Sequence, residues 1–196
     1  MPRIFRITLL AALVLALAIG VAACGDDDDD AAEATTDGAE LVLTGESTTL
    51  ALDEATAGVL TDNGVEVAPV DPATAGDEGI AFPITGGTVE AESLAGTIEH
   101  SGGLVFSAGG TELEVTDFVI DTTDGVLTAT AGGDQIPLLA VDLTALERSD
   151  DSGTIVLEGI ATSLSAEAAI ALNDTFGVDI FEEGIPIGTV TVRATA

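Results

Sequence analysis

The chain has 196 residues, enough for one domain with a hydrophobic core, and 35 acidic residues stand against four arginines, a formal net charge of −31. This balance excludes nucleic acid as a partner, because no basic patch is available to displace the counterions of a phosphate backbone. Tryptophan and tyrosine are absent, which argues against a carbohydrate-binding module or an aromatic cage for cations.

The first 23 residues have the pattern of an export signal. Two arginines within the first six residues precede an apolar run over residues 7–19, and small residues lead to Cys24. A positive start, an apolar stretch and a small-residue processing site are typical of a secretory signal peptide. Because the small residues directly precede a cysteine, the segment resembles a bacterial lipoprotein signal, with Val21–Cys24 as its lipobox.

The alternative for this segment is an uncleaved membrane helix. Residues 7–23 would extend roughly 25 Å as a helix, against a hydrocarbon core of about 30 Å, so length does not decide. Cys24 favours the lipoprotein: it is the only cysteine, so no disulfide within the chain can explain its presence in an exported protein. We therefore expect residues 1–23 to be removed and an extracytoplasmic protein to be held to the cell membrane by lipid on Cys24.

Residues 24–40 are expected to form a tether, beginning with the lipidated cysteine. Asp26–Asp30 are five adjacent like charges that repel one another and bury no apolar surface, which predicts a disordered acidic spacer. A calcium-collecting run is the alternative, although the ligand spacing of an EF-hand loop does not occur. Residues 41–196 are then predicted to form a single β-rich extracytoplasmic domain.

Two helices are expected in this domain. Residues 52–63 begin with acidic residues, which suit a helix N-terminus, and end at a glycine. Residues 164–174 begin beside Ser165, a predicted N-cap, and stop near Gly177. The two segments match at a constant offset of 112 residues, and each copy is followed by a Gly-Val sequence and later by a Gly-Thr-Val strand. This predicts two pseudo-repeated strand–helix–strand units within one domain.

Between the helices, residues 79–143 have the pattern of an antiparallel meander. Short apolar runs alternate with Gly-Gly or Asp-Gly pairs, which are strong hairpin signals because the favoured turns need positive φ angles. The apolar positions also change phase near Thr116–Asp117, which predicts a slip in a half-buried strand. The predicted fold class is therefore β-rich α+β, an antiparallel meander or sandwich flanked by the two repeated units. Turns are expected at residues 86–87, 102–103, 109–110, 124–125 and 132–133.

Few residue combinations in the domain could support catalysis. His100 is the only histidine, and neither a Gly-x-Ser-x-Gly elbow nor a cysteine nucleophile occurs beside it. Metal sites made of several His or Cys ligands are excluded by number. Four aspartates in predicted loops are either calcium ligands or, in the favoured interpretation, turn residues: Asp121, Asp124, Asp150 and Asp151.

Residues 96–104, Gly-Thr-Ile-Glu-His-Ser-Gly-Gly-Leu, resemble the haem-transport-associated (HtaA-type) domain of actinobacterial surface proteins. In that family a glycine-containing strand leads to a histidine–glycine turn, then to an apolar segment like residues 118–120 and Leu-x-Ala strands like residues 127–129. The resemblance covers about residues 84–143 and implies a haem site. The family's haem ligand is a tyrosine, which this chain lacks, so His100 is the one site residue that can be carried over.

The sequence thus predicts a lipid-anchored, acidic protein of a bacterial envelope, actinobacterial by its resemblance, with a non-catalytic binding or interaction role. Its partners would be the membrane, through Cys24, and an envelope protein or a small ligand such as haem, bound with the help of His100. The alternative is a structural envelope protein with no ligand pocket. A deep pocket near His100 would favour the binding module, and a continuous β surface without a cavity would favour the structural role.

Overall fold

The computed structural model describes residues 38–196. The predicted signal peptide, the lipidation site Cys24 and most of the predicted tether lie outside the described residues. In the described part, no helix has both the length and the apolar character needed to cross a membrane. Along the chain the elements are β1 (Glu40–Val42), β2 (Thr44–Leu52), α1 (Glu54–Asp62), β3 (Glu66–Val70), β4 (Thr74–Gly76), β5 (Gly79–Glu90), β6 (Gly96–His100), β7 (Gly103–Ala108), β8 (Thr111–Asp121), β9 (Val126–Ala131), β10 (Asp134–Asp142), β11 (Glu147–Asp151), β12 (Thr154–Leu164), α2 (Ala166–Phe176) and β13 (Pro186–Thr195).

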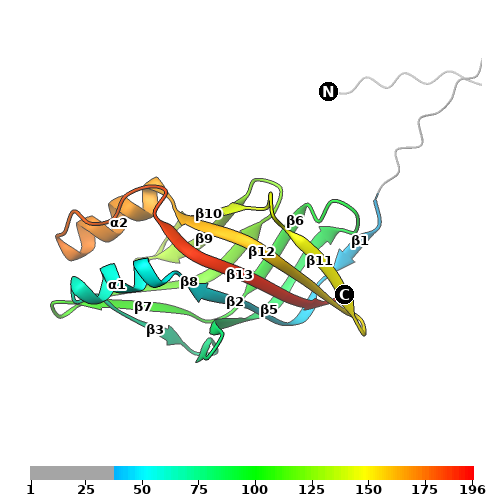
Figure 1. The fold of residues 1–196 in the computed structure, drawn as a ribbon, viewed down its shortest axis with the longest axis horizontal. Coiled ribbons are helices and arrows are strands. Elements are labelled where there is room, and N and C mark those ends of the chain that lie inside the picture. Colours follow the sequence, from blue (N-terminus) through cyan, green and yellow to red (C-terminus); the bar gives the residue numbers. More distant parts are fainter. Residues whose placement is uncertain (1–37) are drawn as a thin grey trace, which may run out of the picture. The chain divides into compact units, whose positions relative to one another are not determined.

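Eight antiparallel strands close into a barrel (Figure 1). Hydrogen bonds join them in the order β5-β2-β13-β12-β10-β9-β8-β6, and β6 pairs with β5 again to complete the ring. The other strands extend this ring: β1 and β4 pair with β5, β11 pairs with β12, and β7 and β3 continue outward from β8. The predicted β-rich α+β class is confirmed, and its meander closes on itself.

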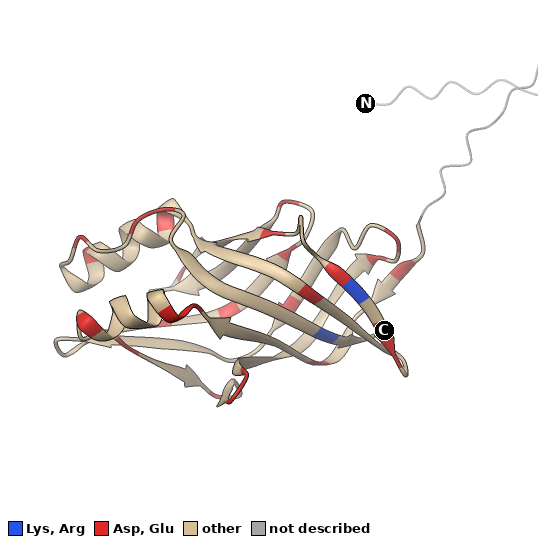
Figure 2. Cartoon of the chain, viewed as in Figure 1, with Lys and Arg blue, Asp and Glu red and all other residues tan. Residues whose placement is uncertain are grey.

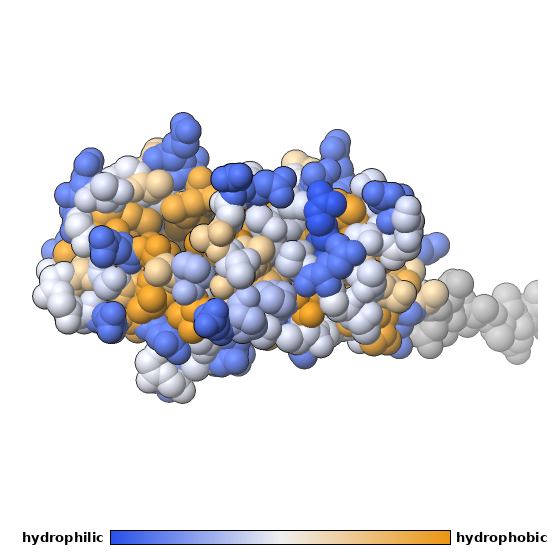
Figure 3. All heavy atoms as spheres, turned by 90° about the horizontal axis from the view of Figure 1, so that it is seen from below, coloured by the Kyte–Doolittle hydropathy of each residue, from blue (hydrophilic) through white to orange (hydrophobic). Residues whose placement is uncertain are grey.

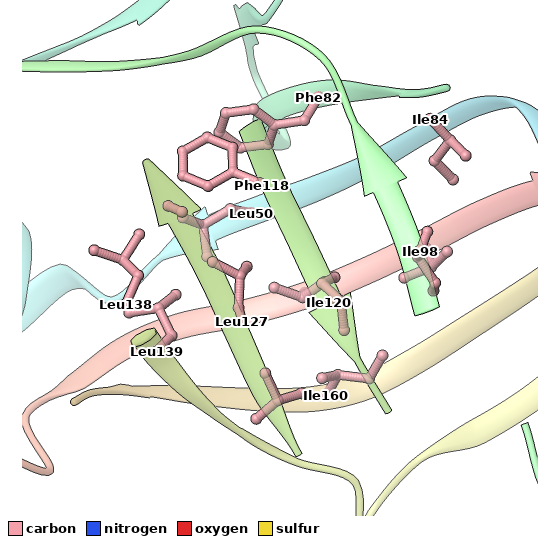
Figure 4. Close-up of a cluster of buried hydrophobic side chains, with 14 of the residues drawn as sticks. Leu50, Phe82, Ile84, Ile98, Phe118, Ile120, Leu127, Leu138, Leu139 and Ile160 are labelled. Atoms are coloured by element: carbon pink, nitrogen blue, oxygen red, sulfur yellow. The ribbon is translucent and has the colours of Figure 1, made fainter. Parts of the chain in front are cut away.

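Apolar side chains that alternate along the strands fill the barrel interior (Figure 4). Eight strands enclose a space that side chains can fill, so a packed core rather than a channel is expected. Phe82 of β5 and Phe118 of β8 meet edge to face, with their ring centroids 5.0 Å apart. Ile98, Val115 and Val192, from three different strands, are the largest fully buried side chains among the described residues.

The phase change predicted in β8 is a β-bulge. The register between β8 and β9 shifts between Thr116 and Val119, and Asp117 has a positive φ of 54°. Without the bulge, strict alternation would turn the second half of the strand outward. With it, Val115 before the bulge and Phe118 after it both point into the core.

Three of the five predicted turns connect paired strands. Residues 109–110 join β7 to β8, residues 124–125 end the β8–β9 connection, and residues 132–133 join β9 to β10. Residues 102–103 instead link β6 to β7, which do not pair with each other in the described sheet. Both pair with β8, one after the other.

The turn predicted at residues 86–87 is wrong. β5 runs without interruption from Gly79 to Glu90. A Cβ on Gly87 would lie 2.2 Å from the carbonyl oxygen of Thr97 on β6. Glycine is therefore needed at this point because two backbones approach closely, and not because the chain reverses.

The two strand–helix junctions repeat at the predicted offset. Asp53 caps α1 and Ser165 caps α2, each accepting hydrogen bonds from backbone N–H groups of the first helical turn. α2 ends at Gly177, whose left-handed conformation (φ 66°, ψ 39°) is the predicted helix stop. Both helices lie at the same end of the barrel, opposite the end that carries β1 and the C-terminus (Figure 1).

The equivalence of the two units ends after the helices. The chain after α1 forms β3, whereas residues 177–180 after α2 form no strand. The side chain of Asn173 holds this segment: its Oδ1 accepts from the backbone N–H groups of Ile180 and Phe181, each at 3.1 Å, and its Nδ2 donates to the carbonyl of Phe181 at 2.8 Å. The chain then enters β13, which closes the second unit.

Candidate ligand-binding cleft

An apolar cleft of about 400 Å³ lies between α1 and α2. α1 contributes Val59 and Leu60, α2 contributes Leu172, and the connection from α2 to β13 contributes Ile180 and Phe181. Figure 3 shows apolar surface gathered at this end of the molecule, with hydrophilic residues around it. The volume falls within the range of sites that bind small molecules, about 300–1,000 Å³.

The repeated units build the two walls of the cleft. Leu52 and Leu164 line it from the ends of β2 and β12, and Leu60 and Leu172 line it from α1 and α2. Within each pair the residue numbers differ by 112, the offset of the repeat. The repeat was visible in the sequence, but only the closed barrel brings its two copies to face each other. The cleft was not predicted from the sequence, although the 112-residue repeat is the feature that could have located it.

Polar contacts fix the walls of the cleft. The hydroxyl of Thr56 on α1 donates to the carbonyl of Pro186, which ties this helix to the start of β13. The hydroxyl of Ser165 donates to the carbonyl of Pro137 at 2.7 Å and ties α2 to β10. Asn173 fixes the third side by holding the backbone that carries Ile180 and Phe181.

Four leucines separate the cleft from the barrel interior. They line both the cleft and a second, much smaller cavity of about 40 Å³ inside the barrel. His100 lies on the far side of this floor, in the lining of the smaller cavity. The four residues are Leu50, Leu104, Leu138 and Leu139.

His100 is a buried residue, 7% exposed, and both of its ring nitrogens are engaged. Nδ1 lies 3.1 Å from the carbonyl oxygen of Phe118, and Nε2 lies 2.7 Å from the hydroxyl of Thr48. A carbonyl can only accept, so Nδ1 carries the proton and Nε2 accepts from Thr48. A role as a ligand would require the Thr48 hydroxyl to release Nε2, and that role stays a prediction.

The ring of His100 is uncharged at neutral pH. Burial lowers its pKa from 6.5 to about 4, although the hydrogen bond to the backbone of Phe118 acts in the opposite direction. The charged form is disfavoured because the surrounding lining is apolar.

Basic side chains lie far from the cleft (Figure 2). In residues 38–196 the arginines are Arg148 on β11 and Arg193 on β13, at the end of the barrel away from the helices. Along extended β13, Arg193 lies six residues from Ile187, roughly 20 Å, and three residues from Val190, the partner of the lining residue Leu50, roughly 10 Å at about 3.3 Å per residue. Among the described residues, the one charged side chain in the cleft lining is that of Asp53, whose Oδ1 already caps α1.

Two of the four aspartates considered as calcium ligands serve a turn and an ion pair. Asp121 Oδ1 accepts from the backbone N–H groups of Thr123 and Asp124, at 2.8 and 3.0 Å. Asp150 pairs with Arg148 at 3.2 Å. Over the described range 38–196, no three His, Cys, Asp or Glu side chains are grouped so that they could hold a metal ion.

Comparison with known proteins identifies the fold. No protein-family model and no curated protein sequence matches this chain. The C-terminal domain of HtaA from Corynebacterium glutamicum has a similar structure, with a TM-score of 0.62 and 16% identity over 79% of this chain and 98% of that chain. The N-terminal domain of the same protein gives 0.55 and 16% over 78% and 97%.

A domain-swapped dimer of a variant of the C-terminal HtaA domain is also similar, with a TM-score of 0.52 and 17% identity over 74% of this chain and 94% of that chain. The fold is therefore that of an HtaA domain, as the resemblance of residues 84–143 implied. At these identities the similarity concerns the fold alone.

Proposed function

We propose that this protein is a lipid-anchored, non-catalytic module of the bacterial envelope that binds a small apolar ligand in the cleft between α1 and α2. The observation that supports this most directly is the cleft itself, about 400 Å³ with a lining of almost only hydrocarbon side chains. Apolar surface left in water costs about 25 cal/mol for each Å². A strongly acidic chain that keeps such a surface open is best explained by a ligand that covers it.

The proposed lipid attachment at Cys24 is supported by the sequence alone. The signal pattern of residues 1–23 and the single cysteine at position 24 support export and lipidation. The HtaA fold supports a binding role, since the HtaA-type resemblance implies a haem-transport-associated domain. The cleft speaks against the structural alternative, which expected a β surface without a cavity.

Haem is the specific ligand that the resemblance implies. The chemistry of the cleft suits its porphyrin ring but not its iron or its propionates. The apolar lining suits the porphyrin ring. Haem iron is commonly held by His, Cys, Met or Tyr, and none of these lines the cleft in the described residues. The propionates would meet Asp53, and no arginine of residues 38–196 belongs to the cleft lining. Haem binding in this chain would therefore depend on His100, beneath the leucine floor.

The proposal is tested with Nile red, an uncharged apolar dye that fluoresces when it leaves water. Residues 25–196 contain the whole barrel and lack the acylated cysteine, so no lipid competes for the dye. We expect saturable binding that Val59→Asp weakens by about tenfold or more, because a carboxylate would have to be desolvated in the cleft. Val59 is 44% exposed, so the barrel core tolerates this change.

Ile170→Asp is the matched control. Ile170 lies on α2, is 62% exposed and does not belong to the cleft lining. This variant should bind the dye within about twofold of the parent, a change of less than about 0.5 kcal/mol. Absence of saturable binding by the parent, or equal losses in both variants, would refute the cleft as a ligand site.

Hemin titration followed at the Soret band completes the test. A saturable shift that is lost in a folded His100→Ala variant would establish haem as the ligand. A shift that is indifferent to this substitution, or no shift, would leave an apolar site without iron coordination.

A further inference from the structure

We propose that the cleft selects uncharged apolar molecules and rejects amphiphiles that carry a charged head, anionic ones above all. The inference rests on the proposed function, because it names the ligand class of the same cleft. A cleft of this kind differs from a site that binds a ligand through the ligand's carboxylates.

The described lining of the cleft contains no counter-charge for an anion. Along β13, a carboxylate beside Ile187 would be roughly 20 Å from Arg193, and one beside Leu50, the partner of Val190, roughly 10 Å, both more than a Debye length of about 8 Å in physiological salt. Either would also share the cleft with Asp53 and lie on a chain whose net charge is −31. An anionic head therefore meets repulsion and no attraction.

A cationic head has a single weak partner in the described part of the cleft. The overall charge attracts a cation to the protein, but the one carboxylate in the lining, Asp53, already serves as the cap of α1. Its Oδ1 accepts from the N–H groups of Ala55 and Thr56, at 2.9 and 3.2 Å. Desolvating an ammonium group is costly when its only partner is a carboxylate that is already shared with two backbone N–H groups. An uncharged molecule meets neither the repulsion nor the desolvation cost of a charged head, and it still covers the apolar walls.

Three ligands with the same twelve-carbon chain test this by displacement of Nile red from residues 25–196. We expect dodecanol to displace the dye at concentrations about tenfold or more below those needed for dodecanoate or dodecylammonium. Dodecanoate that matches dodecanol would overturn the inference and leave the proposed function intact. Dodecylammonium that surpasses dodecanol would overturn it in favour of a site for cationic heads at Asp53. Failure of Nile red itself to bind would instead refute the proposed function.

Variants at the rim test the cause of the selectivity. Val59→Lys places a cation at the cleft, and we expect it to bind dodecanoate about tenfold more tightly than Val59→Gln does, with little change for dodecanol. Ile170→Lys adds the same charge to α2 outside the lining and should leave dodecanoate binding unchanged. An equal gain in both lysine variants, or none in Val59→Lys, would overturn the argument that a missing local cation excludes anions.

Discussion

His100 joins three strands of the barrel through one side chain. It extends from β6, its Nδ1 donates to the backbone of β8 at Phe118, and its Nε2 accepts from Thr48 on β2. A buried polar side chain whose hydrogen bonds are all made destabilises the fold little. Removing one of its partners is far more destabilising, because a buried polar atom is then left without a hydrogen bond. The hydrogen bonds of His100 inside the barrel stabilise the fold by joining β6 to β8 and β2.

The buried ring predicts a pH dependence of stability. The pKa of His100 is about 4 in the folded protein and 6.5 as the ordinary value, so the unfolded chain takes up the proton more readily. The stability contributed by the neutral ring is therefore complete above pH 6.5 and is lost as the pH falls toward 4, about 3 kcal/mol in all. Urea unfolding at pH 7.5, 6.0, 5.0 and 4.5 measures this loss.

His100→Gln supplies the comparison, because the many carboxylates titrate in both proteins and cancel in the difference. We expect the difference in unfolding free energy between parent and variant to fall steadily below pH 6.5. A difference that stays constant from pH 7.5 to 4.5 would contradict a histidine held neutral by burial.

At the scale of elements, the connection between α2 and β13 shapes the cleft without being a regular element. Asn173 holds it through three hydrogen bonds to the backbone of Ile180 and Phe181, whose side chains line the cleft. Asn173→Ala should weaken Nile red binding by about tenfold, because the freed segment must be reordered when the ligand binds. Fluorescence titration of the variant measures the effect.

Two controls accompany this substitution. Asn173→Asp keeps an acceptor for the two N–H groups and loses only the donor to Phe181, so its affinity should lie between those of the parent and the alanine variant. Thermal unfolding shows whether the barrel itself is affected. If Asn173→Ala lowers stability but leaves the dye affinity unchanged, the connection does not shape the cleft.

Local features of the fold could be predicted from the sequence because local chemistry sets them. The cap of α2 at Ser165, its stop at Gly177 and the bulge near Asp117 each depend on residues within a few positions. The pair Gly86–Gly87 carries the same local signal as a true turn. There the strand continues because β6 lies against it, a contact that no short window contains.

The position of His100 was within reach of the sequence. Ile98 and His100 stand two residues apart and both face the core, while Glu99 between them is exposed. This is the alternation of a half-buried strand. The following Gly102–Gly103 pair predicts a turn, which would place His100 at the end of a hairpin. In the structure β6 and β7 do not pair with each other, and both pair with β8 instead, so His100 lies inside the barrel.

At the scale of the whole molecule, β1 and the cleft lie at opposite ends of the barrel. β1, where the described chain begins, pairs with β5 at Val89, and the cleft receives Ile80 from the other end of the same strand. Nine residues of strand between them amount to roughly 30 Å. The first described residues of the chain therefore lie at the end of the barrel opposite the cleft (Figure 1).

The acidic charge acts on the whole molecule and predicts a dependence of stability on salt. The described carboxylates cover a barrel whose arginines are Arg148 and Arg193, so like charges repel in the folded state. We expect the melting temperature of residues 25–196 to rise by several degrees between about 0.02 and 0.5 M NaCl, at about 2–4 °C for each 1 kcal/mol of repulsion removed. KCl should act as NaCl does, because screening depends on ionic strength and not on the identity of the ion.

Calcium separates screening from a specific site in the same measurement. Micromolar calcium hardly changes the ionic strength, so it should leave the melting temperature where it was if Asp121 and Asp150 serve only their turn and ion pair. A rise at micromolar calcium that magnesium does not reproduce would mean that carboxylates gather into a site when the ion arrives, because a ligand of the folded state stabilises it by mass action. Asp121→Asn and Asp150→Asn would then show which loop holds it. If neither salt nor calcium changes the melting temperature, repulsion between the carboxylates is too weak to destabilise the folded state.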